Sequence, residues 1–347
     1  MAMSRLETVF DLPELAPTQG ENIAVLRARS DVTYRMFDKD HLSLANSFRP
    51  TFDRLSAQGF DVSDQIEGSF PRVLVHITRS KIETLGLIAR GFEICAPGGL
   101  VVVDGAKTDG IDSALKQCKS LGFEVGALAK SHGKTFWMRR PPIFPETLDA
   151  WRSGLQISQN KDGFWTAPGM FSPGKTDPGS ALLATHFGPR LKGQIADLGA
   201  GWGWLSMQAF AHADPTGIDL YEAENTALAA ALANISDERA TFIWSDVQAL
   251  TTDQRYDAVI CNPPFHQGRA AEPAIGVDFI NKAADILKPN GRLWMVANRQ
   301  LPYEHSLEQC FGHCKTLEQT PHFKVFLAEK PRSAPFRARQ LSATHSR

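Results

Sequence analysis

Residues 194–203, QIADLGAGWG, join a short apolar stretch to a turn in which glycines stand at positions 199, 201 and 203. Residues 204–211 follow with apolar side chains at helical spacing, so the segment predicts a strand, a glycine turn and a helix. Glycine lets the backbone approach a ligand closely, and the first turn of a helix offers unpaired N–H groups. The segment is therefore typical of an α/β fold that binds a nucleotide-type cofactor beyond the carboxyl end of a parallel strand.

The spacing of these glycines narrows the kind of cofactor. They fall as G-x-G-x-G with an aspartate before them, whereas a dinucleotide site has G-x-G-x-x-G around a pyrophosphate. An acidic residue at the strand end suits a cation better than a phosphate, and the methionine ammonium of S-adenosylmethionine is a cation. We therefore expect S-adenosylmethionine, with S-adenosylhomocysteine as product, and cofactor contacts from Asp197, Gly199, Ala200, Gly201 and Gly203.

Acidic residues follow two more predicted strands. Residues 216–219 predict a strand ending in Asp219, which we expect to accept hydrogen bonds from ribose hydroxyls beside Leu220, with Glu222 as the alternative. Residues 241–244 predict the next strand, after which Asp246 and the backbone of Val247 are expected at the adenine ring. An acidic residue alone is more often a helix cap or a surface charge. The carboxyl ends of successive parallel strands, however, meet at one edge of a sheet, where ligands bind.

A fourth predicted strand, residues 257–261, ends in the tetrapeptide Asn262-Pro263-Pro264-Phe265. An amine conjugated to a base ring is a poor nucleophile, so a methyltransferase must hold it with its lone pair toward the methyl carbon. The side-chain carbonyl of Asn262 and the backbone carbonyl of Pro263 can accept its two hydrogens. The prolines stiffen the loop, and Phe265 offers a face on which a flipped-out base can stack. The tetrapeptide predicts methylation of an amine, with a plain turn as the alternative interpretation.

The two halves of the chain show the same pattern. Residues 73–77, 80–92 and 100–103 predict a strand, a helix and a strand, as do residues 256–261, 274–287 and 293–296. Residues 96–102, APGGLVV, also match residues 288–294, KPNGRLW, which indicates internal duplication, although proline-glycine turns recur in many α/β folds. We therefore expect two tandem Rossmann-like α/β domains.

A proline-rich stretch, residues 139–145, separates the halves. It predicts a first domain over residues 1–145 and a second over residues 146–330. Residues 331–347 have little apolar periodicity and predict a basic tail, either mobile or simply solvated, with Arg332, Arg337, Arg339 and Arg347.

Composition restricts the partners and the compartment. The formal net charge is -1, so nucleic-acid binding would depend on local basic patches. No apolar run is long enough for a signal peptide or a membrane span, and the five cysteines lack the spacing of a disulfide framework. Cys310 and Cys314 flank His313 but fall short of the roughly four ligands of structural zinc. We expect a cytoplasmic protein without a metal.

These motifs together resemble the bacterial small-subunit ribosomal RNA guanine-N2 methyltransferases, the RsmC type, with a large-subunit group related to them. Besides the glycine turn and the Asn-Pro-Pro-Phe loop, the resemblance covers more specific stretches, which favour guanine in ribosomal RNA. They are residues 166–172 (TAPGMFS), Asp177, Gly179, residues 266–268 (HQG), 296–298 (VAN), 301–303 (LPY), 319–320 (QT) and 323–325 (FKV).

The resemblance implies a methyltransferase that acts on the exocyclic N2 amine of a guanine in 16S ribosomal RNA. It implies a monomer whose partner is ribosomal RNA or the small subunit. It also implies a first domain that is degenerate, binds no cofactor and serves substrate recognition or stability. The sequence agrees, because where the second copy has Asn262-Pro263-Pro264-Phe265 the first has residues 78–81 (TRSK) after its strand, so that Thr78 matches Asn262, and no glycine turn precedes that strand. Expected substrate contacts are Phe171, Phe265, His266 and Lys324, with phosphate contacts from Arg79, Lys81 and the tail.

Other functions remain open at this point. The same chemistry could act on a large-subunit guanine, on DNA adenine or on a protein glutamine. A non-catalytic RNA-binding assembly factor is disfavoured because Asp197, Asn262 and Phe265 are all intact. A nicotinamide-dependent oxidoreductase is disfavoured by the glycine spacing and by the Asn-Pro-Pro-Phe loop.

Overall fold

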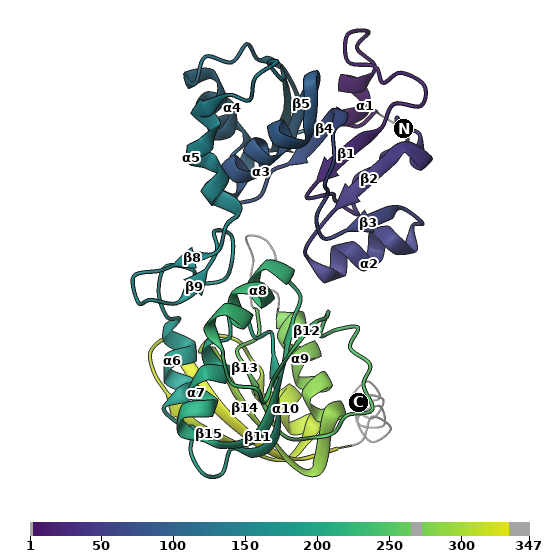
Figure 1. Cartoon of the computed structure of the whole chain (residues 1–347). Coiled ribbons are helices and arrows are strands. Elements are labelled where there is room, and N and C mark those ends of the chain that lie inside the picture. The colour runs from purple at the N-terminus through teal and green to yellow at the C-terminus, as the bar shows by residue number, and fades with distance from the viewer. Residues whose placement is uncertain (1–2, 265–272, 333–347) are drawn as a thin grey trace. The chain divides into compact units, whose positions relative to one another are not determined.

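The computed structural model describes residues 3–264 and 273–332 (Figure 1). The chain forms two compact units. The N-terminal unit runs to Ser158 and takes in Ala167–Met170, while the C-terminal unit holds Gln159–Thr166 and the chain from Phe171 onward. The chain therefore passes between units later than the predicted boundary at residue 145.

The segment after residue 145 stays with the N-terminal unit because it packs against helix α3 (Lys81–Ile94). A Cβ added to Gly86 in this helix would lie 2.8 Å from the backbone carbon of Gly154, so the two backbones touch. The proline-rich stretch is thus a surface connection within the unit rather than the linker itself.

The N-terminal unit is built on a seven-stranded sheet of order β3-β2-β1-β4-β5-β7-β6. Its strands are β1 (Ile23–Leu26), β2 (Leu42–Ala45), β3 (Asp61–Ser63), β4 (Phe70–His76), β5 (Cys95–Ala106), β6 (Gly126–Lys130) and β7 (Gly133–Arg139). Its other helices are α1 (Arg5–Phe10), α2 (Arg49–Ala57), α4 (Ile111–Ser120) and α5 (Asp149–Arg152).

The C-terminal unit has a seven-stranded sheet of order β12-β11-β10-β13-β14-β16-β15. Its strands are β10 (Lys192–Leu198), β11 (Asp214–Glu222), β12 (Ala240–Trp244), β13 (Tyr256–Cys261), β14 (Leu287–Asn298), β15 (Phe311–Gln319) and β16 (Phe323–Pro331). Its helices are α6 (Pro178–Ala184), α7 (Trp204–His212), α8 (Asn225–Asn234), α9 (Pro273–Ile286) and α10 (Glu304–Cys310). A separate small sheet pairs β8 (Ser158–Gln159) with β9 (Trp165–Thr166).

The two large sheets share one topology. In each, the first five strands of the order pair in parallel and the last two pairings are antiparallel, so β7 and β16 run against all the other strands of their sheets. Parallel strands need helical crossovers, which place helices on both faces of a sheet. The predicted fold class, two tandem Rossmann-like domains, is confirmed.

Alternating side chains of the second sheet supply two separate cores. Leu198 faces the cluster that contains Phe279 of α9, whereas Ile195 faces the cluster that contains Leu205 of α7. Burial on both faces explains why β13 (YDAVIC) is apolar at every position except Asp257. It also leaves the ends of the strands as the places where polar side chains can gather.

Two local predictions need correction. The strand predicted to end at Asp219 continues to Glu222, because β11 stays paired with β12 through Glu222 and Trp244. In the N-terminal unit, β1, β2 and β3 precede the part of the chain in which a pattern was recognised. These strands have only three or four residues each, too few to show a period.

Candidate active site

The candidate site lies at the carboxyl edge of the sheet in the C-terminal unit, where four neighbouring parallel strands end. Leu198, the last residue of β10, pairs with Cys261, the last residue of β13. The residues that follow them, Gly199 and Asn262, therefore begin adjacent loops. From here the chain leads to β11 on one side and to β14 on the other, and open α/β sheets bind their ligands at such a switch point.

The glycine loop has a backbone that side chains would disturb. Gly199, Gly201 and Gly203 have φ angles of 73°, 56° and 85°, in the left-handed region that favours glycine. A Cβ on Gly203 would lie 2.8 Å from Cδ1 of Ile235, so the chain after α8 leaves no room for it. A Cβ on Gly201 would meet no described atom within 4 Å. The loop is thus packed tightly at one end and borders open space at Gly201.

Asp197 is a fully buried carboxyl beneath this loop, with 0% of the residue exposed. Its Oδ2 accepts a hydrogen bond of 2.7 Å from the Ser206 hydroxyl, while Oδ1 has no partner among the described residues. Burial raises the pKa of Asp197 to about 7, and the Ser206 hydrogen bond offsets part of that rise. An orphaned buried oxygen of this kind is what a cationic ligand group would satisfy.

The end of β11 supplies Glu222 rather than Asp219. The Glu222 carboxylate accepts the backbone N–H of Gly201 at 2.7 Å and that of Glu224 at 2.8 Å. Burial raises its pKa, and these backbone hydrogen bonds lower it in part. Asp219 instead lies inside the strand, where it accepts hydrogen bonds from Tyr256 at 2.6 Å and Gln194 at 3.2 Å. The structure therefore joins Glu222, the alternative in the sequence prediction, to the glycine loop.

Asp246 and Val247 follow β12 at the same edge. The Asp246 Oδ1 accepts the backbone N–H of Gln248 at 2.9 Å, which closes a turn at this position. Val247 is buried in the core beside α9. Both residues therefore lie just beyond the carboxyl end of β12, the position that the sequence predicts for them.

Asn262 follows β13 directly, and its amide nitrogen is held by two acceptors. Nδ2 donates to Asp177 Oδ2 at 3.0 Å and to Ser180 Oγ at 2.9 Å. The Asn262 Oδ1 has no donor among the described residues. In the sequence, Asp177 belongs to a family motif and nothing predicts a role for Ser180. An aspartate directly before a proline is a typical start of a helix, and this signal could have drawn attention to Asp177.

The remaining predicted residues of this loop are only partly described. Pro263 is buried and Pro264 is exposed. Phe265 and His266 lie outside the described residues.

The other two predicted substrate contacts differ from each other. Phe171 is 53% exposed, so its ring is open to solvent. The Lys324 side chain is only 12% exposed, and its ammonium is paired with the Glu304 carboxylate. The Lys324 ammonium is therefore already paired within the fold, and its role as a substrate contact stays a prediction.

A groove of about 660 Å³ opens beside the amino end of α6 and the carboxyl end of β14. Its lining includes Arg299, whose side chain makes no ion pair with a described residue. The backbone N–H of Arg299 donates to the His322 carbonyl at 2.7 Å, which fixes the base of the side chain. The lining residues are Pro178, Asn298, Arg299, Gln300, Pro321, His322 and Phe323.

The equivalent edge of the N-terminal unit is built differently. Leu26 pairs with Val75 as Leu198 pairs with Cys261, so Arg27 corresponds to Gly199 and His76 to Asn262. Arg27 keeps the left-handed backbone, with φ at 52°, but carries a side chain that pairs with Glu83 at 2.7 Å. This register also corrects the predicted match of Thr78 with Asn262 by two positions.

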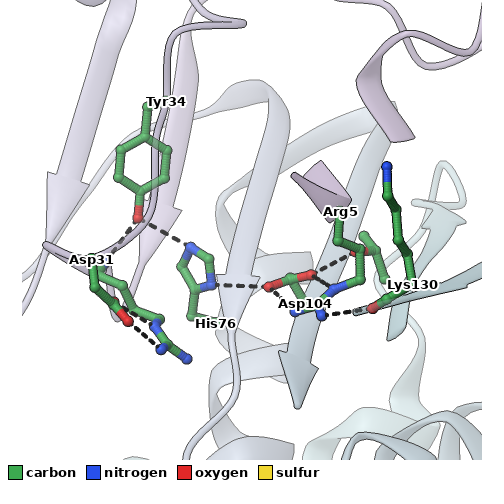
Figure 2. Close-up of polar contacts among 8 residues, drawn as sticks. Arg5, Asp31, Tyr34, His76, Asp104 and Lys130 are labelled. Carbon is green, nitrogen blue, oxygen red and sulfur yellow. Dashed lines mark hydrogen bonds and ion pairs between the residues drawn. The ribbon is translucent and has the colours of Figure 1, made fainter. Parts of the chain in front are cut away.

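Buried charges occupy that edge, as Figure 2 shows around His76. Its ring contacts the Tyr34 hydroxyl at 3.1 Å and Asp104 Oδ2 at 3.6 Å, and Arg5 binds the other Asp104 oxygen at 2.6 Å. Burial raises the pKa of Asp104, but His76 and Arg5 outweigh it and hold the pKa below its usual range. With an arginine for a glycine and this network beside it, the first copy has lost the features that mark the site in the second.

The described part of the chain shows neither a cluster of metal ligands nor a membrane-spanning helix. No group of three or more histidine, cysteine, aspartate or glutamate side chains is placed there to hold a metal ion. None of the helices described is both long enough and apolar enough to cross a bilayer.

Comparison with known proteins assigns the family. Residues 161–327 match the model of the methyltransferase small domain. The ribosomal RNA small subunit methyltransferase C of Shewanella pealeana is 30% identical, over 74% of this chain and 76% of its own length. The ribosomal RNA large subunit methyltransferase G of Shewanella amazonensis is 31% identical, over 67% of this chain and 62% of its own length.

A solved structure agrees on the fold. The T. thermophilus 16S rRNA N2 methyltransferase (RsmC), in complex with AdoMet and guanosine, superposes with a TM-score of 0.72 at 24% identity. The match covers 93% of this chain and 92% of that one, so both units share its architecture. The chain belongs to the family of S-adenosylmethionine-dependent ribosomal RNA methyltransferases that contains the small-subunit methyltransferase C and large-subunit methyltransferase G proteins.

Proposed function

We propose that this enzyme methylates the exocyclic N2 amine of a guanine in small-subunit ribosomal RNA. The observation that carries the proposal is the Asn262 amide, whose nitrogen is engaged by Asp177 and Ser180 while its oxygen is left to accept. An exocyclic amine has two hydrogens to donate and needs acceptors of this kind. The small-subunit methyltransferase C relatives, and the guanosine named with the T. thermophilus structure, favour guanine as the base.

The residues at the sheet edge fit S-adenosylmethionine. Gly201 borders open space, Glu222 stands where ribose hydroxyls would donate, and Asp246 follows the next strand, within reach of an adenine amine. The unpartnered Oδ1 of Asp197 fits the methionine ammonium. When bound, the cofactor supplies a methyl group on a positively charged sulfur, and the chain has to position the nucleophile.

That positioning falls to the loop after β13. Asn262 Oδ1 and the backbone carbonyl of Pro263 would accept one amine hydrogen each, which turns the nitrogen lone pair away from them. Both atoms are stiffly placed, because Asn262 is anchored through its amide and Pro263 has a fixed φ and is buried. No general base is needed before methyl transfer, since a neutral amine is already the nucleophile, and the methylated nitrogen loses its extra proton to water after the transfer.

The groove beside this loop is proposed to hold the RNA strand next to the target base. Pro178 lies in its wall, directly after the Asp177 that binds Asn262. Arg299 offers an exposed guanidinium to a phosphate, and His322 and Phe323 offer ring faces. The predicted contacts Phe171, Phe265 and His266 are kept in the proposal as stacking or hydrogen-bonding partners of the base.

The N-terminal unit is proposed to recognise the substrate and to stabilise the enzyme rather than to bind cofactor. Its Arg27 stands where Gly199 admits a ligand in the C-terminal unit. This role is the one that the sequence analysis assigned to the first domain.

The proposal is tested by transferring labelled methyl from S-adenosylmethionine to ribosomal RNA that lacks the modification, followed by nuclease digestion and nucleoside analysis. We expect label in N2-methylguanosine. Label in a methylated adenosine or cytidine would contradict the base assignment. The 31% identity with a large-subunit methyltransferase G supports large-subunit RNA as a second candidate, which separating the two ribosomal RNAs before digestion distinguishes.

A further inference from the structure

The Asn262 side chain has both of its amide hydrogens committed. A primary amide carries two N–H donors, and Nδ2 lies 3.0 Å from Asp177 Oδ2 and 2.9 Å from Ser180 Oγ. The carbonyl oxygen is then the remaining polar atom of the amide. Its direction is fixed by what the nitrogen binds, so these two partners decide which atom of Asn262 meets the substrate.

The identity of the partners fixes the sense of the amide. A carboxylate only accepts hydrogen bonds, so the end of the amide that faces Asp177 must be the NH2 group. A reversed amide would place its oxygen against a negatively charged oxygen and would present NH2 to the substrate amine, where two donors would face each other. Asp177 therefore excludes the unproductive orientation.

Asp177 is itself held in place from two sides. Its Oδ2 also accepts the backbone N–H of Ser180 at 2.8 Å, as the N-cap of α6. A Cβ added to Gly179 would lie 3.0 Å from that same oxygen and 3.0 Å from the Phe323 ring, so only glycine leaves the carboxylate and the ring undisturbed. Ser180 is 8% exposed, which keeps water from competing for the amide.

We infer that Asp177 and Ser180 are positioning residues that orient the Asn262 amide for methyl transfer. The inference rests on the proposed function, because it takes Asn262 Oδ1 as the acceptor of the substrate amine. The Asp177 charge adds a second effect. During transfer, positive charge moves from the cofactor sulfur to the amine nitrogen, so its N–H bonds become stronger donors. An amide polarised by a carboxylate accepts them better at that moment than in the ground state.

A substitution series at Asp177 separates capping from positioning. In Asp177→Asn the side-chain oxygen can still accept from Asn262 and from the Ser180 backbone, but the negative charge is lost. In Asp177→Ser the hydroxyl can still cap α6, but the side chain is too short to reach Asn262. Asp177→Ala loses both the cap and the contact with Asn262. We expect kcat to fall at most about threefold in Asp177→Asn and at least roughly tenfold in Asp177→Ser and Asp177→Ala. KM for RNA and the Kd for S-adenosylmethionine should stay within about twofold throughout. A wild-type kcat in Asp177→Ser overturns the inference.

A cap in the other unit provides the control for stability. The Ser80 hydroxyl accepts the backbone N–H of Glu83 at the start of α3. Ser80→Ala should lower Tm as a lost cap does and leave kcat unchanged. If Ser80→Ala lowers kcat as much as Asp177→Ser does, the effect at Asp177 is one of stability and the inference is wrong.

A second measurement does not depend on which base is methylated. The side-chain amide protons of Asn262, observed by 15N NMR in the full-length protein, should exchange with solvent at least about tenfold faster in Asp177→Ser than in wild type. Equal exchange in both overturns the inference even if guanine is the substrate. If the wild-type enzyme instead methylates another amine, the proposed function fails. The role of Asp177 is then still tested by measuring kcat on that substrate for Asp177→Asn, Asp177→Ser and Asp177→Ala.

Discussion

The backbone N–H of Gly201 donates to the carboxylate of Glu222 at 2.7 Å, which ties the glycine loop after β10 to the end of β11. The bond orients one carboxylate oxygen into the loop and leaves lone pairs at the edge where a ribose would lie. The loop and the acidic residue therefore form one binding element rather than two.

Glu222→Ala should weaken S-adenosylmethionine binding by roughly 10- to 100-fold, because it removes both the ribose acceptor and a support of the loop. Asp219→Asn is the matched control, since Asp219 bonds Tyr256 and Gln194 inside the sheet. We expect it to cost stability but to leave cofactor affinity unchanged, as measured by calorimetric titration. The opposite ranking of the two variants would restore Asp219 as the ribose contact.

The Asp219 prediction illustrates a limit of sequence reasoning. The sequence predicts that the second strand ends at Asp219, but the letters IDLYE do not show that pairing with β12 continues to Glu222. Asp219 is tolerated inside the strand because Tyr256 and Gln194, distant in sequence, hydrogen-bond it. Partners of this kind are fixed by tertiary structure and cannot be predicted from a local pattern.

Asn262→Ala should reduce methyl transfer at least roughly 100-fold with unchanged cofactor affinity, because it removes an acceptor that positions the amine. Single-turnover transfer to ribosomal RNA and a cofactor titration measure the two quantities separately. Full turnover in this variant would show that Asn262 does not position the nucleophile.

The tetrapeptide that begins at Asn262 can be recognised in the sequence because it is a motif. The hydrogen-bond partners of Asn262 cannot be recognised in this way, because Asp177 is 85 residues away along the chain. In the N-terminal unit, the sequence alone matches Thr78 to Asn262. The strand register instead matches His76 to Asn262, two positions earlier.

Asp197→Asn tests the buried carboxyl. Since burial raises the pKa of Asp197 to about 7, the folded protein binds more protons than the unfolded chain between its usual pKa of 3.8 and that value. Stability is therefore lost as the pH rises through this window. The measured quantity is the free energy of unfolding of wild type minus that of Asp197→Asn, both without cofactor. We expect this difference to fall by ~2–4 kcal/mol from pH 4 to pH 8. A difference that does not vary with pH would contradict the raised pKa.

Arg299→Ala should weaken RNA binding roughly three- to tenfold and reduce the slope of log Kd against log salt by about one, as the loss of a phosphate contact does. Arg190→Ala is the control, because Arg190 precedes β10 at the opposite edge and pairs with Glu329 at 2.9 Å. Equal effects of the two substitutions would assign the loss to net charge rather than to the groove.

The altered edge of the N-terminal unit predicts the cofactor stoichiometry. Arg27 in place of a glycine, with the His76 and Asp104 network beside it, leaves that unit without the glycine loop of the C-terminal unit. Calorimetric titration should give a single S-adenosylmethionine per chain, and Glu222→Ala should weaken that single site. Two equivalents in wild type would show that the first unit also binds cofactor.

The central claim is tested most directly by methyl transfer to assembled small and large subunits and to their isolated RNAs, all from a strain that lacks this enzyme. Nucleoside analysis should find labelled N2-methylguanosine in small-subunit RNA from wild-type enzyme and almost none from Asn262→Ala. Label confined to large-subunit RNA, or to a nucleoside other than N2-methylguanosine, would contradict the account.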